Sequence, residues 1–265
     1  MKPVIVRNVA IGEGIPKICV PIVGRTREEI AAAAEALKGL PVDVVEWRVD
    51  WFKESGEFIA VKEVLEILRK MLGDMPLLFT FRTAAEGGEK AIEGEAYREL
   101  AVKAAQTGLI DLLDVEVFLG DELVKAVIGA AHSAHVAVIG SNHDFDGTPS
   151  DEDMMTRFKK MRDLGADILK LAVMPRDRKD VLRLLTVTET IDRESPDHPV
   201  IIMSMSGTGA ISRLCGEVFG SALTFGCVGR GSAPGQIEVR ELAEVLKVIH
   251  GGYDDDIQTA SHRGR

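Results

Sequence analysis

The sequence predicts one α/β domain folded as a (β/α)8 barrel, also called a TIM barrel, and two observations lead to this fold class. Eight short apolar runs rich in β-branched residues alternate with eight stretches of helical periodicity, at roughly 30 residues per unit. Such alternation is typical of parallel βαβ units, and eight units in one chain indicate a closed barrel. The 265 residues, 46% of them hydrophobic, suffice for one core of this size. An open doubly wound sheet is the alternative fold.

The predicted elements follow in regular order, and no linker or low-complexity segment divides them into two domains. The strands are expected at residues 17–23, 42–49, 77–81, 110–117, 136–139, 168–173, 200–205 and 222–228. Clear helical periodicity covers residues 27–39, 62–73, 95–108, 121–133, 151–165 and 237–250. Many of these stretches end in glycine, the usual residue just after a helix. Pro149 or Ser150 is expected at the start of the fifth helix.

The two ends of the chain do not follow this alternation. Residues 2–14 have a weak pattern that fits a short hairpin or a cap on the barrel. Residues 251–265 are polar and aperiodic, which predicts a loose, flexible tail. The barrel domain is therefore expected over residues 1–250.

Charge and cysteine content restrict what the protein binds and where it works. Thirty-two basic against 42 acidic residues give a net charge of −10, which disfavours binding to nucleic acid or to an anionic membrane. The chain begins without the apolar core of a signal peptide and has no apolar run long enough to cross a bilayer. Its three cysteines are widely spaced, as is typical of reduced thiols. We expect a cytoplasmic protein.

One lysine, Lys170, interrupts the apolar run over residues 166–174, which is predicted to be a buried strand. A buried ammonium must be paired or become neutral, and a neutral lysine is a nucleophile that forms imines with ketones. The simpler alternative is a lysine whose aliphatic stem packs on the core while its head stays in water.

Charged side chains also occur near the ends of the second, third and fifth strands, where barrels of this class carry their chemistry. Glu46 and Arg48 share a strand face, either as a structural ion pair or as contacts to a polar ligand. Arg82 ends the third strand and Glu86 follows it; two inward arginines suggest an anionic or hydroxyl-rich ligand. His143, just past the fifth strand, is a candidate acid and base. A metal site is disfavoured because no second strand end carries a histidine.

The last two strands lead into further candidate residues. Met203 and Met205 share a face and are either core residues or an apolar wall for a ligand. Arg213 follows in a helix within reach of the barrel mouth, although an arginine on a solvated helix face is the simpler interpretation. The glycine-rich loop 229–236 could bind an anion through backbone amides or act as a mobile lid, and its spacing does not fit a dinucleotide fingerprint.

These residues together indicate an imine site with an acid/base partner at the mouth of the barrel. The arginines would bind an acidic substrate and disfavour the charged form of the lysine.

Seven motifs, in order and at matching spacing, resemble type I 3-dehydroquinate dehydratase from about residue 3 to residue 250. They are E-W-R-V-D at 46–50, F-T-F-R-x-x-x-E-G-G at 79–88, S-N-H-D-F at 141–145, K-L-A-V-M-P at 170–175, M-S-M-S-x-T-G-x-I-S-R-L at 203–214, E-V-F-G-S at 217–221 and S-A-P-G-Q at 232–236.

The resemblance implies a (β/α)8 barrel, usually a homodimer, that converts 3-dehydroquinate to 3-dehydroshikimate and water in the shikimate pathway without metal or organic cofactor. It implies that Lys170 forms the imine, that His143 is the proton donor and acceptor, and that Glu86 orients His143. The implied substrate contacts are Glu46, Arg48, Arg82, Arg213, Ser232 and Gln236. The implied pocket walls are Met203, Met205, Phe145, Phe225 and Ala233.

Two positions depart from the family pattern: Pro21, where the family often has a small hydroxyl residue, and 229–231, where Gly-Arg-Gly replaces a pattern with lysine and alanine. Two other functions fit parts of the site. A class I aldolase would use the lysine together with a phosphate-binding eighth loop. A binding protein with a vestigial site would retain the ligand contacts without turnover.

Overall fold

A computed structural model describes residues 2–229 and 233–263, with side chains up to residue 252, and it confirms the barrel. Eight parallel strands form the ring: β3 to β9 pair in chain order, and β10 pairs with β3. The ring closes where Ala222 N donates a hydrogen bond to Val200 O at 2.7 Å. The strands are β3 (Lys17–Ile22), β4 (Val44–Arg48), β5 (Leu77–Thr80), β6 (Leu112–Glu116), β7 (Ala137–Asp144), β8 (Ile168–Val173), β9 (Val200–Ser204) and β10 (Leu223–Cys227).

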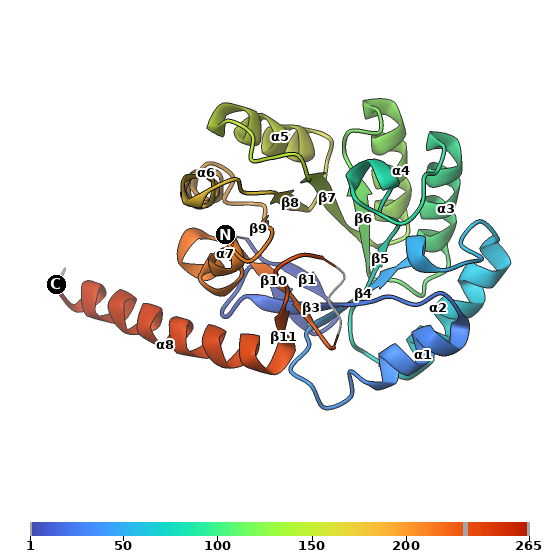
Figure 1. The fold of residues 1–265 in the computed structure, drawn as a ribbon, viewed down its shortest axis with the longest axis horizontal. Helices are drawn as coiled ribbons and strands as arrows, with labels where there is room; N and C mark the ends of the chain where they lie inside the picture. Colours follow the sequence, from blue (N-terminus) through green and yellow to red (C-terminus); the bar gives the residue numbers. More distant parts are fainter. Residues whose placement is uncertain (1, 230–232, 264–265) are drawn as a thin grey trace.

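The α-helices of the described chain lie outside the ring of strands (Figure 1). They are α1 (Arg27–Glu35), α2 (Phe58–Leu72), α3 (Gly94–Gln106), α4 (Asp121–Ser133), α5 (Asp151–Asp163), α6 (Arg178–Glu194), α7 (Ala210–Leu214) and α8 (Val239–Arg263). Ser150 caps α5 by accepting a hydrogen bond from Asp153 N, as the sequence predicted. The short strand β11 (Ile237–Glu238) pairs with β10 ahead of α8.

Strand β7 is longer than predicted and ends at Asp144 instead of residue 139. Its polar end pairs in register with β8, up to Asp144 opposite Val173. This pairing satisfies backbone groups that the local sequence alone would leave to a loop. His143 therefore stands on a strand and not on the loop after it, which fixes its position in the barrel wall.

The core has two parts, separated by the sheet. Outward-facing side chains such as Trp47 and Phe79, in edge-to-face contact at 5.8 Å, pack between the strands and the helices. A second apolar cluster fills the barrel interior from the strand starts up to the cavity; it comprises Val6, Ile11, Cys19, Val44, Leu78, Leu112, Ile139, Ile168, Ala172, Ile201, Met203, Met205, Ala222, Leu223 and Phe225. Because this cluster fills the end of the barrel where the strands begin, a ligand can enter only from the end where the strands finish.

The N-terminal segment is the hairpin that the sequence allowed. Strands β1 (Val4–Val6) and β2 (Val9–Ile11) pair antiparallel. Val6 and Ile11 belong to the inner cluster, and Arg7 forms ion pairs with Asp111 at 2.7 Å and Asp74 at 3.2 Å. The hairpin therefore covers the end of the barrel opposite the catalytic mouth.

The polar stretch from residue 251 onward, which was expected to be a loose tail, extends helix α8 in the structure. Helix α8 continues without a break to Arg263, so the backbone of 251–263 is helical. Its last turns project beyond the barrel in Figure 1. Two adjacent glycines, Gly251 and Gly252, weaken a helix but do not end it. Of the helices described here, none has the length and apolar character needed to cross a membrane.

Candidate active site

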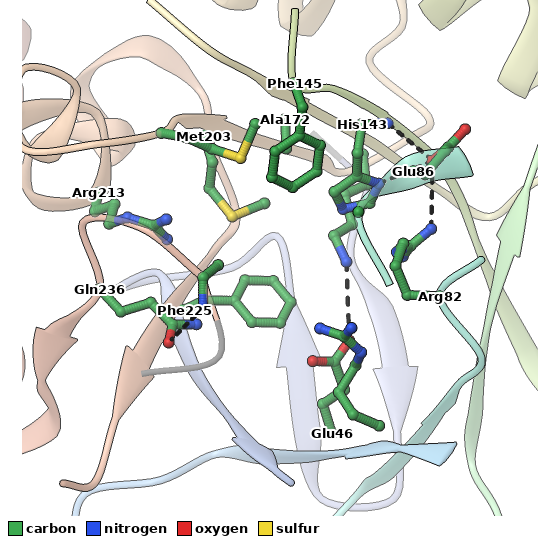
Figure 2. Close-up of a pocket in the computed structure, with 15 residues that line it drawn as sticks. Glu46, Arg82, Glu86, His143, Phe145, Ala172, Met203, Arg213, Phe225 and Gln236 are labelled. Carbon is green, nitrogen blue, oxygen red and sulfur yellow. Dashed lines mark hydrogen bonds and ion pairs between the residues drawn. The ribbon is translucent and has the colours of Figure 1, made fainter. Parts of the chain in front are cut away.

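A cavity opens at the C-terminal ends of the strands (Figure 2). Its lining consists of Glu46, Arg48, Arg82, Glu86, Gly87, His143, Phe145, Lys170, Ala172, Met203, Met205, Arg213, Phe225, Ala233 and Gln236. The structure thus brings together every site residue predicted from the sequence apart from Ser232, which lies outside the described residues together with Arg230 and Gly231. Pro21 pairs with Glu46 across β3 and β4 and does not line the cavity.

Lys170 points from β8 into the cavity and is only 2% exposed. Its Nζ donates to Asp114 Oδ2 at 3.0 Å and lies 4.0 Å from Glu46 Oε1. The ammonium also sits 4.6 Å from the centre of the Phe225 ring, a cation–π contact. The alternative with a solvated lysine head is therefore wrong, and carboxylates lie directly against the lysine.

Asp114, on β6, was not singled out in the sequence, yet it is central to the site. It is fully buried and accepts hydrogen bonds from Lys170, from Arg82 Nη2 at 2.6 Å and from Ser141 Oγ at 2.6 Å. Burial by itself would raise the pKa of Asp114, but Arg82 and Lys170 outweigh it and hold that pKa well below its usual range. Asp114 therefore stays ionised beside the lysine nitrogen.

Arg82 binds three carboxylates, although it was predicted to contact substrate. Besides Asp114, its guanidinium reaches Glu116 Oε1 at 2.9 Å and Glu86 Oε2 at 3.4 Å. Glu116 in turn accepts from the backbone and the hydroxyl of Thr83. Arg82 lines the cavity, but its donors are largely used in holding these acidic groups in place.

Glu46 and Arg48 share the inner face of β4, as predicted, but they do not pair with each other. Arg48 forms a bidentate ion pair with Asp50, both bonds 2.8 Å long, because the chain turns into a short 3-10 helix directly after β4. Glu46 accepts instead from Thr80 Oγ1 at 2.8 Å. Glu46 thereby remains close to Lys170 at the base of the cavity.

His143 and Glu86 form a hydrogen-bonded pair on one side of the cavity. Glu86 Oε2 accepts from His143 N at 2.9 Å and lies 3.1 Å from Nδ1, which leaves Nε2 for a molecule in the cavity. Burial, together with Arg82 and Lys170, lowers the pKa of His143 well below its ordinary value. Burial also raises the pKa of Glu86 to about 7. The imidazole is therefore held neutral, the form that can act as a base.

Arg213 lies on the side of the cavity opposite to His143 and Glu86, next to Gln236 (Figure 2). It is 1% exposed, and burial lowers its pKa to about 10. Its Nη2 donates to Pro234 O at 3.1 Å, whereas Nε and Nη1 have no hydrogen-bond partner among the described residues. The interpretation as a solvated arginine is thus wrong. A buried guanidinium with unused donors is a site for an anion.

Apolar side chains separate these two polar sides. In Figure 2, Met203 and Phe145 stand between Arg213 and His143 on one wall, and Phe225 faces them from β10. Met205 completes the wall. The cavity can therefore hold a small molecule with an anionic group at one end and a reactive carbonyl near Lys170.

Comparisons with known proteins agree with this site. The family model for type I 3-dehydroquinase matches residues 18–253. A 3-dehydroquinate dehydratase from Clostridioides difficile (strain 630) is 52% identical over 245 residues, 92% of this chain and 96% of that protein. The 3-dehydroquinate dehydratase of Listeria innocua is 52% identical over 250 residues, 94% of this chain and 99% of that protein.

Solved structures show the same likeness. The type I 3-dehydroquinate dehydratase structure from Clostridium difficile has a TM-score of 0.92 at 51% identity and covers 95% of this chain and 98% of its own. The enzyme from Geobacillus kaustophilus HTA426 has a TM-score of 0.91 at 38% identity, with coverage of 94% and 97%. The matches favour the dehydratase over the class I aldolase. The chain therefore belongs to the type I 3-dehydroquinase family, the hydro-lyases that dehydrate 3-dehydroquinate in the shikimate pathway.

Proposed function

We propose that this chain dehydrates 3-dehydroquinate to 3-dehydroshikimate through an imine on Lys170, with His143 as the proton carrier and Glu86 orienting it. One observation carries the proposal: a single cavity contains a buried lysine, a histidine held neutral and, on the opposite side, the guanidinium of Arg213, whose Nε and Nη1 have no hydrogen-bond partner among the described residues. An amine and a base are the groups needed to remove a proton next to a ketone.

The steps follow from these positions. Lys170 transfers one ammonium proton to the ketone oxygen and attacks the ketone carbon as an amine; the oxygen leaves as water, and an iminium forms. The iminium withdraws electrons, so His143 can remove the neighbouring carbon-bound proton through Nε2 and leave an enamine. The enamine expels the β-hydroxyl, which takes the proton back from His143 and departs as water. A second water then hydrolyses the imine and frees Lys170.

Charged neighbours support each stage. Asp114 lies 3.0 Å from the lysine nitrogen and would face the positive charge of the iminium throughout the cycle. Arg213 and Gln236 would bind the substrate carboxylate and hydroxyls on the far side. Glu46 and Arg48 would contact the remaining hydroxyls, with Arg82 holding the acidic groups around them, and Ser232 is proposed as a further contact.

Reductive trapping tests the proposal directly. The protein is mixed with 3-dehydroquinate, treated with borohydride, and analysed by intact and peptide mass spectrometry. A mass increase on Lys170 is expected. Lys170→Arg keeps a cation beside Asp114 but cannot form the imine, so it should fold normally, show no adduct and have no turnover. Product formation by wild-type protein without any adduct, or normal turnover by Lys170→Arg, would contradict the imine.

We further propose a cytoplasmic homodimer. The three cysteines are free, which supports a reducing compartment. Leu182, Ile211 and Val218, between 44% and 63% exposed on α6, α7 and the turn after α7, form the apolar face expected at the dimer contact. Sedimentation should show a dimer for the wild type and a monomer for Leu182→Glu combined with Ile211→Glu. An unchanged dimer in the double variant would move the contact to another face.

A further inference from the structure

Asn142 precedes His143 on β7 but does not line the cavity, because adjacent residues of a strand face opposite sides. Its side chain bridges two groups. Nδ2 donates to Glu86 Oε1 at 2.8 Å, and Oδ1 accepts from Arg157 Nη1 at 2.8 Å. Asn142 is 7% exposed; its bond to Glu86 is buried, and its bond to Arg157 is partly buried. The bridge joins the helix α5, which packs against β7, to the carboxylate beside His143.

Arg157 determines which end of this amide meets Glu86. A guanidinium has only donors, so the atom of Asn142 that faces Arg157 must be the oxygen. The amide nitrogen then has to face Glu86, whose ionised carboxylate only accepts. Arg157 is itself held on α5, by Asp144 at 3.0 Å and Asp153 at 2.9 Å. The amide is therefore fixed in the one orientation that donates to the carboxylate.

The two oxygens of Glu86 have separate partners. Oε1 receives the amide of Asn142, while Oε2 receives His143 N and faces Nδ1. Two anchors fix the plane of a carboxylate, whereas one would let it rotate toward Arg82, whose Nη1 lies 3.4 Å from Oε2. The contact between Glu86 and the imidazole ring thus depends on a donor outside the cavity.

We propose that Asn142 and Arg157 are positioning residues for the dehydration. Arg157 orients the amide of Asn142, and that amide aligns the carboxylate of Glu86 with the His143 ring. The inference rests on the proposed roles of Glu86 and His143, and it adds two residues that act through them.

The surroundings make Glu86 sensitive to this donor. The charged groups that face it are Arg82 from the loop after β5, Asp114 and Glu116 from β6, and His143 from β7. Burial and the carboxylates of β6 raise its pKa to about 7, while Arg82 and the amide of Asn142 lower it. Near neutral pH Glu86 is therefore close to its midpoint, and loss of one donor protonates it.

Steady-state kinetics over a range of pH test the proposal. Asn142→Leu has a similar volume but no donor, and kcat should fall about 10- to 100-fold, the value of one hydrogen bond to a charged group. The pKa of the acid limb of the kcat profile should rise by about one. KM should change little, because substrate contacts remain. Arg157→Gln should act in the same direction with a smaller effect, and Arg157→Lys should restore much of the rate.

Two controls separate positioning from a general structural role. Asp153→Asn removes a partner of Arg157 without touching the amide and should leave the pH profile unchanged. In a Glu86→Gln background, Asn142→Leu should have almost no further effect, because the group that it positions has lost its charge. If Asn142→Leu does not fold, Arg157→Gln can replace it, because Arg157 lies at the half-buried end of the bridge. The measurement is again kcat as a function of pH.

Borohydride trapping on Lys170 distinguishes this inference from the proposed function. If wild-type protein shows no adduct, the imine mechanism fails and the inference with it. If the adduct forms and both Asn142→Leu and Arg157→Gln keep the wild-type kcat and pH profile, only the positioning role is overturned. A lower kcat without a shift of the acid limb would also overturn it, since the amide would then not act through Glu86.

Discussion

Replacing Arg213 by methionine should reduce catalysis while leaving the free protein as stable as before or more stable. The guanidinium is buried, and its Nε and Nη1 have no partner among the described residues. Bidentate binding of the substrate carboxylate would add two charge-assisted hydrogen bonds, each worth about 1.5–3 kcal/mol. Their loss in Arg213→Met should lower kcat/KM about 10²- to 10⁴-fold.

The effect on stability has the opposite sign. Burial lowers the pKa of Arg213 to about 10, which corresponds to roughly 3 kcal/mol against the charged form in the free protein. Methionine removes this cost together with one hydrogen bond to Pro234 O. Because about 1 kcal/mol shifts Tm by roughly 2–4 °C in a chain of this size, Tm should be unchanged or up to about 10 °C higher.

The same substitution at Arg48 is the matched control. Arg48 is also buried, but it forms a bidentate pair with Asp50, which is 0% exposed. Arg48→Met would leave that carboxylate buried and unpaired, at a cost of about 3–5 kcal/mol. Its Tm should therefore fall by roughly 6–20 °C. The two variants remove the same group from the same cavity and should move Tm in opposite directions.

Calorimetry of the free proteins and initial rates with 3-dehydroquinate provide the two readouts. Substrate or a carboxylate analogue should raise the Tm of the wild type and not that of Arg213→Met. The reasoning is refuted if Arg213→Met retains kcat/KM within about threefold of the wild type, or if its Tm falls as far as that of Arg48→Met, because Arg213 would then be a structural residue.

Three further changes test other parts of the site. Asp114→Asn removes the charge beside Lys170 and should destabilise the fold by about 3–5 kcal/mol in urea unfolding; an unchanged midpoint would contradict the ionic cluster. Glu86 has a folded pKa raised to about 7 from 4.5, so its ionisation destabilises the fold as pH rises through 7. The Tm of Glu86→Gln minus the Tm of the wild type should therefore increase between pH 5 and pH 8. A difference in Tm that does not change with pH would contradict the raised pKa of Glu86. Gly87 has φ +81° and a Cβ there would lie 2.3 Å from the Phe145 ring, so Gly87→Ala should lower both Tm and kcat/KM. Adding Phe145→Ala should recover part of the loss, and no recovery would place the strain in the backbone alone.

The sequence was sufficient for the barrel because its signal is periodic. Each strand of the ring overlaps a predicted apolar run, and the alternation along β4 correctly placed Glu46 and Arg48 on the inner face. The sequence also indicated Lys170 and Arg213 as candidate site residues, but it did not indicate which side chains surround them. The pairing of each carboxylate with a lysine or arginine depends on the distances between side chains on neighbouring strands. The residue pattern along a single strand does not predict those distances.

Asp114 and Glu116, which the sequence analysis did not single out, carry a recognisable pattern. The run L-L-D-V-E at 112–116 has two acidic residues at period two inside a buried strand, the same signal that marked Glu46 and Arg48. Glu116 ends β6 and Asp114 lies two residues before it, so both point into the barrel below its mouth. The end of β7 was predicted too early because the last five residues of this strand are polar or glycine. Only their pairing with β8 keeps them extended.

The N-terminal hairpin has a consequence for how the chain folds. Its residues are synthesised before the strands of the ring, yet Val6 and Ile11 share an apolar cluster with residues of β9 and β10, and Arg7 pairs with Asp111. Lys2 N donates to Pro196 O, close to 200 residues away in the chain. Contacts of such large sequence separation slow folding, because much of the chain must be ordered before they form. The hairpin therefore leaves the ribosome before the barrel strands but docks among the last elements, and its apolar side chains stay exposed until the strands that it covers have assembled.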